Sequence, residues 1–466
     1  MQHHRVAPDE PDGHSAVVAP TTRLSKVVQR ARYRCFHVGS RAVKTLKGRS
    51  FADLVSLYAV YIATYVVPLV TVPYLSRTLG PQGWGLVAFF QSFALTMALV
   101  IEYGFGYSAT RELAVSRDTP SARAAIFSDV MAAKAIIVVA TCPVALLLLR
   151  NVGNLHNNTG LFAAACVSAL AQGFNLAWYY QGMDRITEQA KMDLCTRAIG
   201  AVAIFMLVKT PEHGFRALLV NAGSAAGGLV WGLSKLRTGH AIPRPTLSGG
   251  LAALKAGGAV FLHRAALSLY TLGNGFILGL LAAPIYVGYY AGAERIARGM
   301  QGFLIPLSQV IYSRTNYAFS KSRSDALRIA RRGLFLMVIA GAMIGLILAI
   351  TAKTLVTLVL GPQYGPAILA LQIFAILPPI AALATSLGVH WMIPLRFDRP
   401  YALITVVSGL MNLILASVLA TRYHQNGMCL SVIFSEVAAA LSCFIYLACK
   451  GYSPLRVNPT DVLTLE

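Results

Sequence analysis

The stretch GLVAFFQSFALTMALVIEYGFG, residues 85–106, decides the fold class of this chain. As far as Ile101 it is almost entirely apolar, and as a helix it is long enough to cross a hydrocarbon core about 30 Å thick. Glu102 follows directly and leads into a segment of glycine and tyrosine. An ionised side chain at the membrane centre costs about 2.5–3.5 kcal/mol on insertion scales, so such residues usually face a partner or a watery cavity. A specific role for Glu102 is therefore expected.

The composition extends this interpretation to the whole chain. Of the 466 residues, 56% are hydrophobic and only 12% are charged, and the mean hydropathy is +0.61. A typical soluble domain has about 25% charged residues. The sequence predicts an all-α membrane protein with about twelve transmembrane helices, near residues 52–75, 84–107, 125–149, 159–182, 190–208, 215–236, 256–281, 286–311, 333–352, 367–393, 401–421 and 428–449.

The positions of the basic residues predict the orientation of these helices. The net charge is +22, and the cations are concentrated in the first 50 residues and in every second predicted loop. The alternate loops hold only a few: Arg77, Arg150, Lys209, Arg216, Lys353 and Arg422. Cytoplasmic loops of membrane proteins carry the excess of lysine and arginine. Both termini are therefore predicted to be cytoplasmic, and no nucleic-acid partner is needed to explain the charge.

The chain divides into two predicted lobes. Residues 1–50 form a basic cytoplasmic N-terminal extension, 51–236 an N-lobe of helices one to six, 237–255 a cytoplasmic linker, 256–450 a C-lobe of helices seven to twelve, and 451–466 a cytoplasmic tail. The linker assignment rests on Pro243, Pro245, Gly249 and Gly250, since proline and glycine mark loops. The extension is compatible with an interfacial helix and with an unstructured tail.

A short repeat supports two similar halves. Residues 80–85, GPQGWG, and residues 283–288, APIYVG, both read Pro-x-x-x-Gly at the turn of a predicted hairpin. Parallel repeats that meet at a central pathway are typical of many secondary transporters. The predicted loops are too short for a catalytic domain, and the chain has no GxxxxGK[ST] or HExxH motif. We therefore expect no catalytic residues, metal or cofactor.

Charged side chains mark one face of two predicted helices. Gln91 and Glu102 are eleven residues apart, close to three helical turns. Glu102 either forms an ion pair, with Arg111 or across helices, or acts in transport. Glu294 and Arg298 are spaced to pair at i and i+4, with Gln301 on the same face. Arg295 beside them leaves an uncompensated positive charge unless an anion visits or another helix supplies a carboxylate.

Other predicted helices carry further polar side chains. Lys134, Arg197 and Arg264 are cations within apolar runs, and Arg197 is spaced to pair with Asp193. Tyr270 and Asn274 extend the face of His263, which neighbours Arg264. A third stripe, at i, i+3 and i+7, suits either sugar binding or interhelical hydrogen bonds; it consists of Gln172, Asn175 and Tyr179. Together these residues predict a solvated central cavity.

Three segments resemble a known family. PYLSRTLGPQGWGLVAFFQSF, residues 73–93, followed by EYGFGYSATRELA, residues 102–114, resembles the opening hairpin of bacterial polysaccharide transporters. These are the O-antigen and exopolysaccharide flippases of the multidrug/oligosaccharidyl-lipid/polysaccharide exporter superfamily. LVTLVLGPQYGPA, residues 355–367, resembles the outer turn between helices nine and ten of the same family. The resemblance covers about residues 50–450.

The resemblance implies a fold of two six-helix lobes in a V. It implies alternating access that carries an undecaprenyl-diphosphate-linked oligosaccharide across the bacterial inner membrane for O-antigen, exopolysaccharide or capsule biosynthesis. The candidate diphosphate-binding residues are Arg264, Arg295 and Arg298, with Lys134 and Arg197 as further cavity cations. The candidate glycan contacts are Gln91, Gln172, Asn175, Tyr179, Tyr270, Asn274 and Gln301. Glu102 and Glu294 are the candidates for charge balance or ion coupling.

Two alternatives remain open from the sequence. One is a cation-coupled exporter of small amphipathic molecules from the drug-exporting branch of the superfamily, which a cavity of net negative charge would favour; the predicted cavity leans positive. The other is a membrane polymerase or ligase of lipid-linked sugars, for which we expect a substantial outer loop. The partners expected for a flippase are the lipid-linked oligosaccharide, membrane lipids, a polysaccharide polymerase and a chain-length regulator.

Overall fold

The computed structural model describes residues 67, 70–236, 238, 241–452 and 454, without the side chains of 259–260 and 262–272. This part of the chain is helical and has no strand. Seven of its helices are long and apolar enough to cross a membrane. The predicted all-α, multi-pass membrane protein is therefore confirmed. The predicted N-terminal extension, residues 1–50, lies outside the described residues, as do most residues of the first predicted helix.

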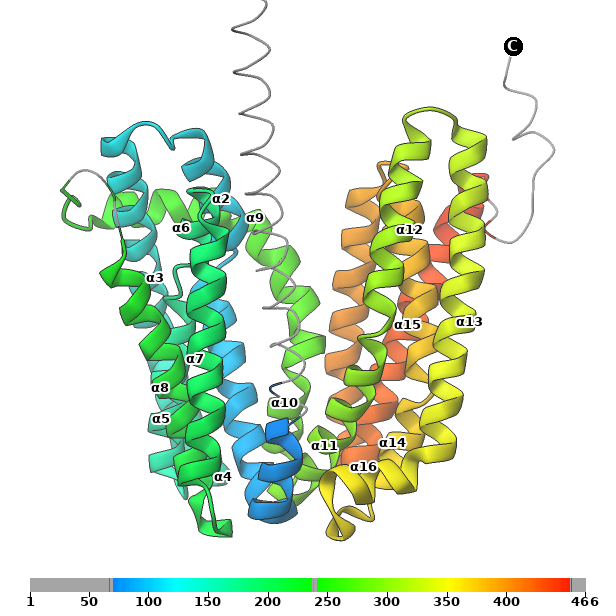
Figure 1. Ribbon diagram of the computed structural model, residues 1–466, viewed down its shortest axis with the longest axis horizontal. Coiled ribbons are helices and arrows are strands. Elements are labelled where there is room, and N and C mark those ends of the chain that lie inside the picture. Colours follow the sequence, from blue (N-terminus) through cyan, green and yellow to red (C-terminus); the bar gives the residue numbers. More distant parts are fainter. Residues whose placement is uncertain (1–66, 68–69, 237, 239–240, 453, 455–466) are drawn as a thin grey trace, which may run out of the picture. The chain divides into compact units, whose positions relative to one another are not determined.

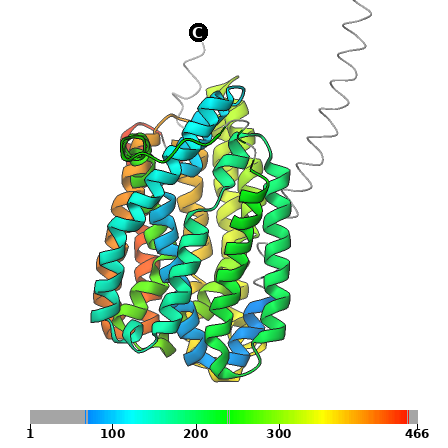
Figure 2. The same ribbon diagram turned by 90° about the vertical axis from the view of Figure 1, so that its left-hand side faces the viewer.

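The first half of the chain forms a bundle of long helices. Residues 70–102 are helical with a turn at Gly80, whose φ is 68°. The helices that follow are α2 (Phe105–Val115), α3 (Pro120–Asn151), α4 (Gly153–His156), α5 (Thr159–Gly173), α6 (Ala177–Gly182), α7 (Ile186–Leu207) and α8 (Gly214–Ser234), with a short 3₁₀ turn at Pro211–His213. Figure 1 shows α3, α5, α7 and α8 side by side, and Figure 2 shows the molecule turned by 90° so that this bundle faces the viewer. Within this bundle α8 packs against both α5 and α7.

The second half begins with α9 (Leu247–Leu272), α10 (Asn274–Leu281), α11 (Pro284–Gln301), α12 (Leu304–Phe319) and α13 (Arg323–Leu355). After the π-helix Val356–Leu360 and the 3₁₀ turn Pro362–Tyr364 come α14 (Ala367–Phe374), α15 (Leu377–Thr385), the π-helix Ser386–Met392 and α16 (Asp398–Cys449). The 52 residues of α16 contain a non-helical residue, His424, with φ 48° and ψ −125°. Since about 20 residues span a membrane, α16 is the eleventh and twelfth predicted helices joined across this kink.

Several predicted helices are broken within their length. The α-helix is interrupted within residues 84–107 at Tyr103 and Gly104, within 159–182 at 174–176, within 256–281 at Gly273, and within 286–311 at 302–303. The hydrophobic pattern did not predict these breaks, because apolar residues continue across them. Non-helical backbone at membrane depth is tolerated where it is buried in protein. The breaks therefore mark places where side chains must satisfy the exposed backbone groups.

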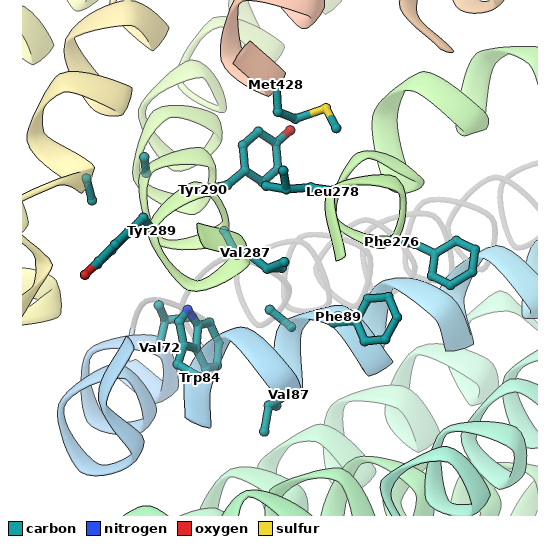
Figure 3. Packing of buried hydrophobic residues seen from close by; sticks show 14 of the residues in the cluster. Val72, Trp84, Val87, Phe89, Phe276, Leu278, Val287, Tyr289, Tyr290 and Met428 are labelled. Atoms are coloured by element: carbon teal, nitrogen blue, oxygen red, sulfur yellow. The ribbon is translucent and has the colours of Figure 1, made fainter. Parts of the chain in front are cut away.

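The largest hydrophobic cluster joins both halves of the chain. Trp84, Phe89 and Phe93 come from the helix after Gly80, and Phe276 and Tyr290 come from α10 and α11; all are buried. The rings of Phe89 and Phe276 stack with centroids 5.6 Å apart and planes inclined by 19°, and Figure 3 shows them facing each other. Because lipid is as apolar as these side chains, close packing rather than water exclusion favours such contacts inside a membrane.

The two Pro-x-x-x-Gly motifs lie against each other. A Cβ added at Gly85 would overlap the carbonyl oxygen of Pro284 and lie 2.9 Å from the amide nitrogen of Gly288. A Cβ added at Gly288 would overlap the carbonyl oxygen of Pro81 and lie 3.3 Å from the amide nitrogen of Gly85. Small residues allow backbones to approach this closely. We call residues 81–85 and 284–288 the glycine junction; each motif supplies the glycine that receives the other's proline carbonyl.

The same end of the molecule carries further contacts between the halves. The Tyr364 hydroxyl donates to the carbonyl oxygen of Ser76 over 3.0 Å. The Arg77 guanidinium donates to the carbonyl oxygen of Leu358, and the Asn154 amide donates to that of Gly279 over 2.9 Å. Each of these side chains occupies a backbone acceptor of the opposite half. The glycine junction is thus surrounded by hydrogen bonds that tie the two halves together.

Candidate functional site

Two predicted site residues meet beside the glycine junction. Arg295 of α11 donates from Nη2 to Oε1 of Gln91 over 2.8 Å. Its guanidinium carbon also lies 4.4 Å from the ring centroid of Trp84, which is fully buried. A cation over a tryptophan face is attracted by the ring quadrupole. Arg295 therefore links the two halves of the chain through two kinds of contact.

Glu294 and Arg298 form the ion pair that their spacing predicts. Arg298 Nε donates to Glu294 Oε1 over 2.9 Å, and the side chains are 38% and 18% exposed, respectively. The Tyr290 hydroxyl donates to the same carboxylate oxygen over 3.1 Å. All three residues lie on one face of α11, where i and i+4 side chains are neighbours. Arg298 keeps enough exposure to meet a ligand, whereas Glu294 is more enclosed.

A carboxylate that sequence reasoning missed lies near this pair. Glu436 of α16 is within electrostatic reach of Arg298 and is only partly exposed. It is a carboxylate from another helix, but it interacts with Arg298, whereas the carboxylate near Arg295 is Glu294. The signal was present as a single acidic residue in the apolar run of residues 428–449. The α11 cluster thus consists of two carboxylates and two arginines, together with Tyr290.

Glu102 accepts hydrogen bonds from backbone amides at a helix break. Its Oε1 accepts the backbone N–H of Gly106 over 2.6 Å, and its Oε2 accepts that of Gly104 over 3.2 Å. These amides belong to the start of α2, whose N-cap residue Gly104 has φ 77°. A carboxylate is favoured at a helix N-terminus because it meets unsatisfied N–H groups and the positive end of the helix dipole. The position of Glu102 after a long apolar run therefore has a structural reason.

Lys134 donates hydrogen bonds to backbone carbonyls at the neighbouring break, between α5 and α6. It is fully buried, and its ammonium donates to the carbonyl oxygens of Gly173 over 2.8 Å and of Asn175 over 3.4 Å. These carbonyls lie at and just beyond the C-terminal end of α5, where a cation is favoured by the dipole. Lys134 is also within electrostatic reach of Glu102. The predicted cavity cation thus lies inside the protein, bound to backbone.

The predicted glycan-contact residues of the first half also make protein contacts. Asn175 Oδ1 accepts the backbone N–H of Ala177 over 2.7 Å at the start of α6. Gln172 Nε2 donates to Ser168 Oγ over 2.8 Å. Tyr179 is fully buried and forms an edge contact with Trp178. Of these three, Gln172 and Asn175 are partly exposed.

The remaining predicted residues are dispersed. Asn274 is fully buried and its Oδ1 accepts from Asn412 Nδ2 over 2.8 Å. Gln301 is partly exposed at the end of α11. Arg197 is exposed and lies within electrostatic reach of Asp193. The side chains of Arg264 and Tyr270 lie outside the described residues. The structure therefore brings together Gln91 with the α11 cluster, and Glu102 with Lys134, as two separate groups.

A surface hollow is lined by residues of neither group. Its volume is about 420 Å³, and it is lined from segments 83–87, 157–161 and 211–215. It contains none of the predicted site residues, so we place the candidate site at the charged clusters instead. Within the described ranges, no group of three or more His, Cys, Asp or Glu side chains is arranged to hold a metal ion.

Comparisons with known proteins identify relatives. A family model described as "Polysaccharide biosynthesis protein" matches residues 50–312. The protein named "Putative O-antigen transporter" in Escherichia coli (strain K12) is 27% identical over 82% of this chain and 93% of its own length. The protein of the same name in Shigella dysenteriae is 25% identical over 84% of this chain and 98% of its own. These relatives are named as transporters, not as enzymes.

Solved structures share the fold. The lipid II flippase MurJ, in an inward closed conformation, matches with a TM-score of 0.69 over 88% of this chain and 89% of its own, at 14% identity. A multidrug resistance MATE family transporter in an inward-facing conformation matches with a TM-score of 0.63 over 85% of this chain and 98% of its own, at 15% identity. At these identities the likeness concerns the arrangement of helices.

Proposed function

The chain belongs to the polysaccharide biosynthesis protein family, and we propose that it is a flippase for undecaprenyl-diphosphate-linked oligosaccharide repeat units. In this proposal it works in the bacterial inner membrane, by alternating access, in the biosynthesis of O-antigen, exopolysaccharide or capsule. The names of its relatives and the shared fold of a lipid II flippase support this direction. The observation that carries it is the partly exposed Arg298 on α11.

The diphosphate is the part of the proposed substrate that most needs counter-charges from the protein. Two linked phosphates cannot enter an apolar medium without counter-charges, and arginine offers paired N–H donors that match phosphate oxygens. We assign this role to Arg298 first and to Arg264 as a second candidate. On this assignment Arg298 exchanges Glu294 for the diphosphate, while Glu294 keeps its hydrogen bond from Tyr290.

Arg295 has a different role in this proposal. Its contacts with Gln91 and Trp84 make it part of the joint between the halves, so it could bind the diphosphate only after these contacts break. When the halves separate at the glycine junction, these contacts break and Arg295 becomes available at the newly exposed surface. The contacts of Arg295 are therefore present when the junction is closed and absent when it is open. The lipid tail stays in the bilayer, and the glycan passes between the halves toward a polymerase and a chain-length regulator on the far side.

A second function is favoured by one observation. Glu436 and Glu294 both lie near Arg298, so the α11 cluster is less cationic than the sequence predicted. Carboxylates of this kind suit cation-coupled export of small amphipathic cations, and a MATE transporter shares the fold. Under this alternative the carboxylates, rather than Arg298, contact the transported molecule.

The decisive test is the sidedness of the lipid-linked oligosaccharide in cells that lack this protein. A glycan-specific probe that cannot cross the membrane would be applied to spheroplasts, with and without a complementing copy. The flippase proposal expects the glycolipid to accumulate inside and to reappear outside on complementation. Glycolipid that is already outside but unpolymerised would contradict it and assign the protein to a later step. An unchanged glycolipid together with altered sensitivity to cationic drugs would support the exporter.

A further inference from the structure

The two breaks in the first half lie at the same level. The helix of residues 81–102 ends at Tyr103 and Gly104, which have φ values of 50° and 77°. α5 ends at Gly173, and a Cβ added there would lie 2.6 Å from the Cβ of Ile101. The two helices therefore touch at the point where each stops. A left-handed conformation at a residue other than glycine is sparsely populated and persists only where the surroundings impose it.

Beyond the breaks, α2 and α6 continue as a packed pair. Thr110 Oγ1 donates to the carbonyl oxygen of Trp178 over 3.1 Å. A Cβ added at Gly182 would lie 2.8 Å from Leu113 Cδ2, so the helix surfaces are in close contact. Arg117 Nε, just after α2, donates to the carbonyl oxygen of Gly182 over 3.1 Å. The pair is thus joined along its length, and its buried side chains belong to a hydrophobic cluster that α3 and Met192 of α7 complete.

Two oppositely charged side chains form hydrogen bonds with the backbone groups at the two breaks. Glu102 accepts amides at the start of α2, and Lys134 donates to carbonyls around the end of α5. The charges match the two helix ends that they meet, and they are within electrostatic reach of each other. Neither charge is replaceable by the other, because N–H groups need an acceptor and carbonyls need a donor.

The break at Tyr103 also contacts the second half. The Tyr103 ring stacks on Phe261 of α9 with centroids 4.3 Å apart and planes inclined by 15°. A Cβ added at Gly257 would lie 3.4 Å from Tyr103 Cδ1. α9 in turn packs along α3 and against α16. A rotation at Tyr103 would therefore have to move against α9, which packs on helices of both halves.

From this geometry we propose that α2 and α6 move as one rigid pair about the adjacent breaks at 103–104 and 174–176, with Glu102 and Lys134 as the positioning residues that set the pair's orientation. Hinges of this kind consist of a few terminal residues that absorb a change in φ and ψ. A helix of 11 residues is about 16 Å long. A rotation of roughly 15° about one end would move the other end by about 4 Å.

Distances between spin labels test the motion in the full-length protein in nanodiscs, with the native cysteines replaced by alanine. Labels at the exposed positions 115 and 167 measure the distance between α2 and α5. Labels at the exposed positions 115 and 181 measure the distance between α2 and α6. The state is perturbed in two ways: by adding undecaprenyl diphosphate, and by Gly288→Ala, which forces the glycine junction apart. We expect the 115–167 distance to shift by about 4 Å while the 115–181 distance stays constant. A 115–181 distance that changes equally would overturn the rigid pair.

The two perturbations separate this proposal from the proposed function, on which only the ligand arm rests. A 115–167 shift with Gly288→Ala but not with undecaprenyl diphosphate would keep the hinge and count against the flippase substrate. No shift with either would overturn the hinge whatever the substrate is.

Substitutions at the positioning residues test their roles. The charge exchange Glu102→Lys with Lys134→Glu keeps opposite charges but reverses donors and acceptors, so we expect it to broaden the 115–167 distribution and not to restore it. Glu102→Gln with Lys134→Gln keeps an acceptor and a donor without charge, so we expect it to keep one main 115–167 distance. A narrow, native-like distribution in the charge-exchanged protein would show that mutual charge neutralisation, not helix capping, sets the orientation.

Discussion

Replacing Gly288 by alanine should weaken the protein through the glycine junction. The added Cβ would overlap the carbonyl oxygen of Pro81 and lie 3.0 Å from its carbonyl carbon. Both are backbone atoms, so no side-chain rotation relieves the overlap, and the two motifs must separate. Overpacking of this kind costs about 1–3 kcal/mol. The free energy of unfolding should fall by that amount relative to a matched control.

Gly299→Ala on the same helix is that control, because a Cβ added at Gly299 meets no atom within 4 Å. Both variants gain the same helix propensity of alanine over glycine, about 1 kcal/mol, so their difference isolates the overlap. The measurement is the unfolding midpoint of the purified protein in a titration with SDS. Equal midpoints for the two variants would refute the close approach of the motifs.

The reciprocal geometry adds a second expectation. Gly85→Ala should also destabilise, because its Cβ would overlap the carbonyl oxygen of Pro284. One separation of the motifs relieves both overlaps, so Gly85→Ala with Gly288→Ala should cost clearly less than the sum of the single changes. Sites in contact often show such coupling, whereas distant sites add. Additive losses would mean that the two overlaps are relieved independently.

Three further predictions concern single side chains. Arg298→Ala should abolish polymer export while the protein remains at wild-type level in the membrane by immunoblot, with Arg298→Lys retaining part of the activity; loss of the protein itself would show a structural role. Arg295→Lys keeps a charge but not the planar group over Trp84, and the midpoint of SDS unfolding should drop by an amount equivalent to about 0.5–1 kcal/mol; an unchanged midpoint would remove the cation–π contact from the joint. Tyr364→Phe removes the hydrogen bond to the carbonyl oxygen of Ser76 and should cost about 1 kcal/mol in the same titration, whereas a stabilised variant would contradict that hydrogen bond's contribution.

Local patterns in the sequence predicted what local geometry determines. Apolar runs predicted the transmembrane helices, and the i, i+4 spacing predicted the ion pair of Glu294 and Arg298. The contact of Arg295 with Gln91 joins residues two hundred positions apart, and no spacing encodes it. Glu102 was singled out correctly as an unusual residue, but its partners include backbone amides, which no choice of side chains reveals.

The repeated Pro-x-x-x-Gly motif has a structural role that a sequence comparison alone would miss. Two similar motifs in two halves suggest common ancestry, but ancestry does not require them to touch. Here each glycine receives the other motif's proline carbonyl, so both motifs need the same residue at the same place for the junction to close. Because the joint beside it also holds the Arg295 guanidinium against Trp84 and Gln91, we expect opening of the junction to expose a cation. An anionic substrate in the open state would therefore bind Arg295 in place of Gln91, and closure would return the arginine to its protein partners.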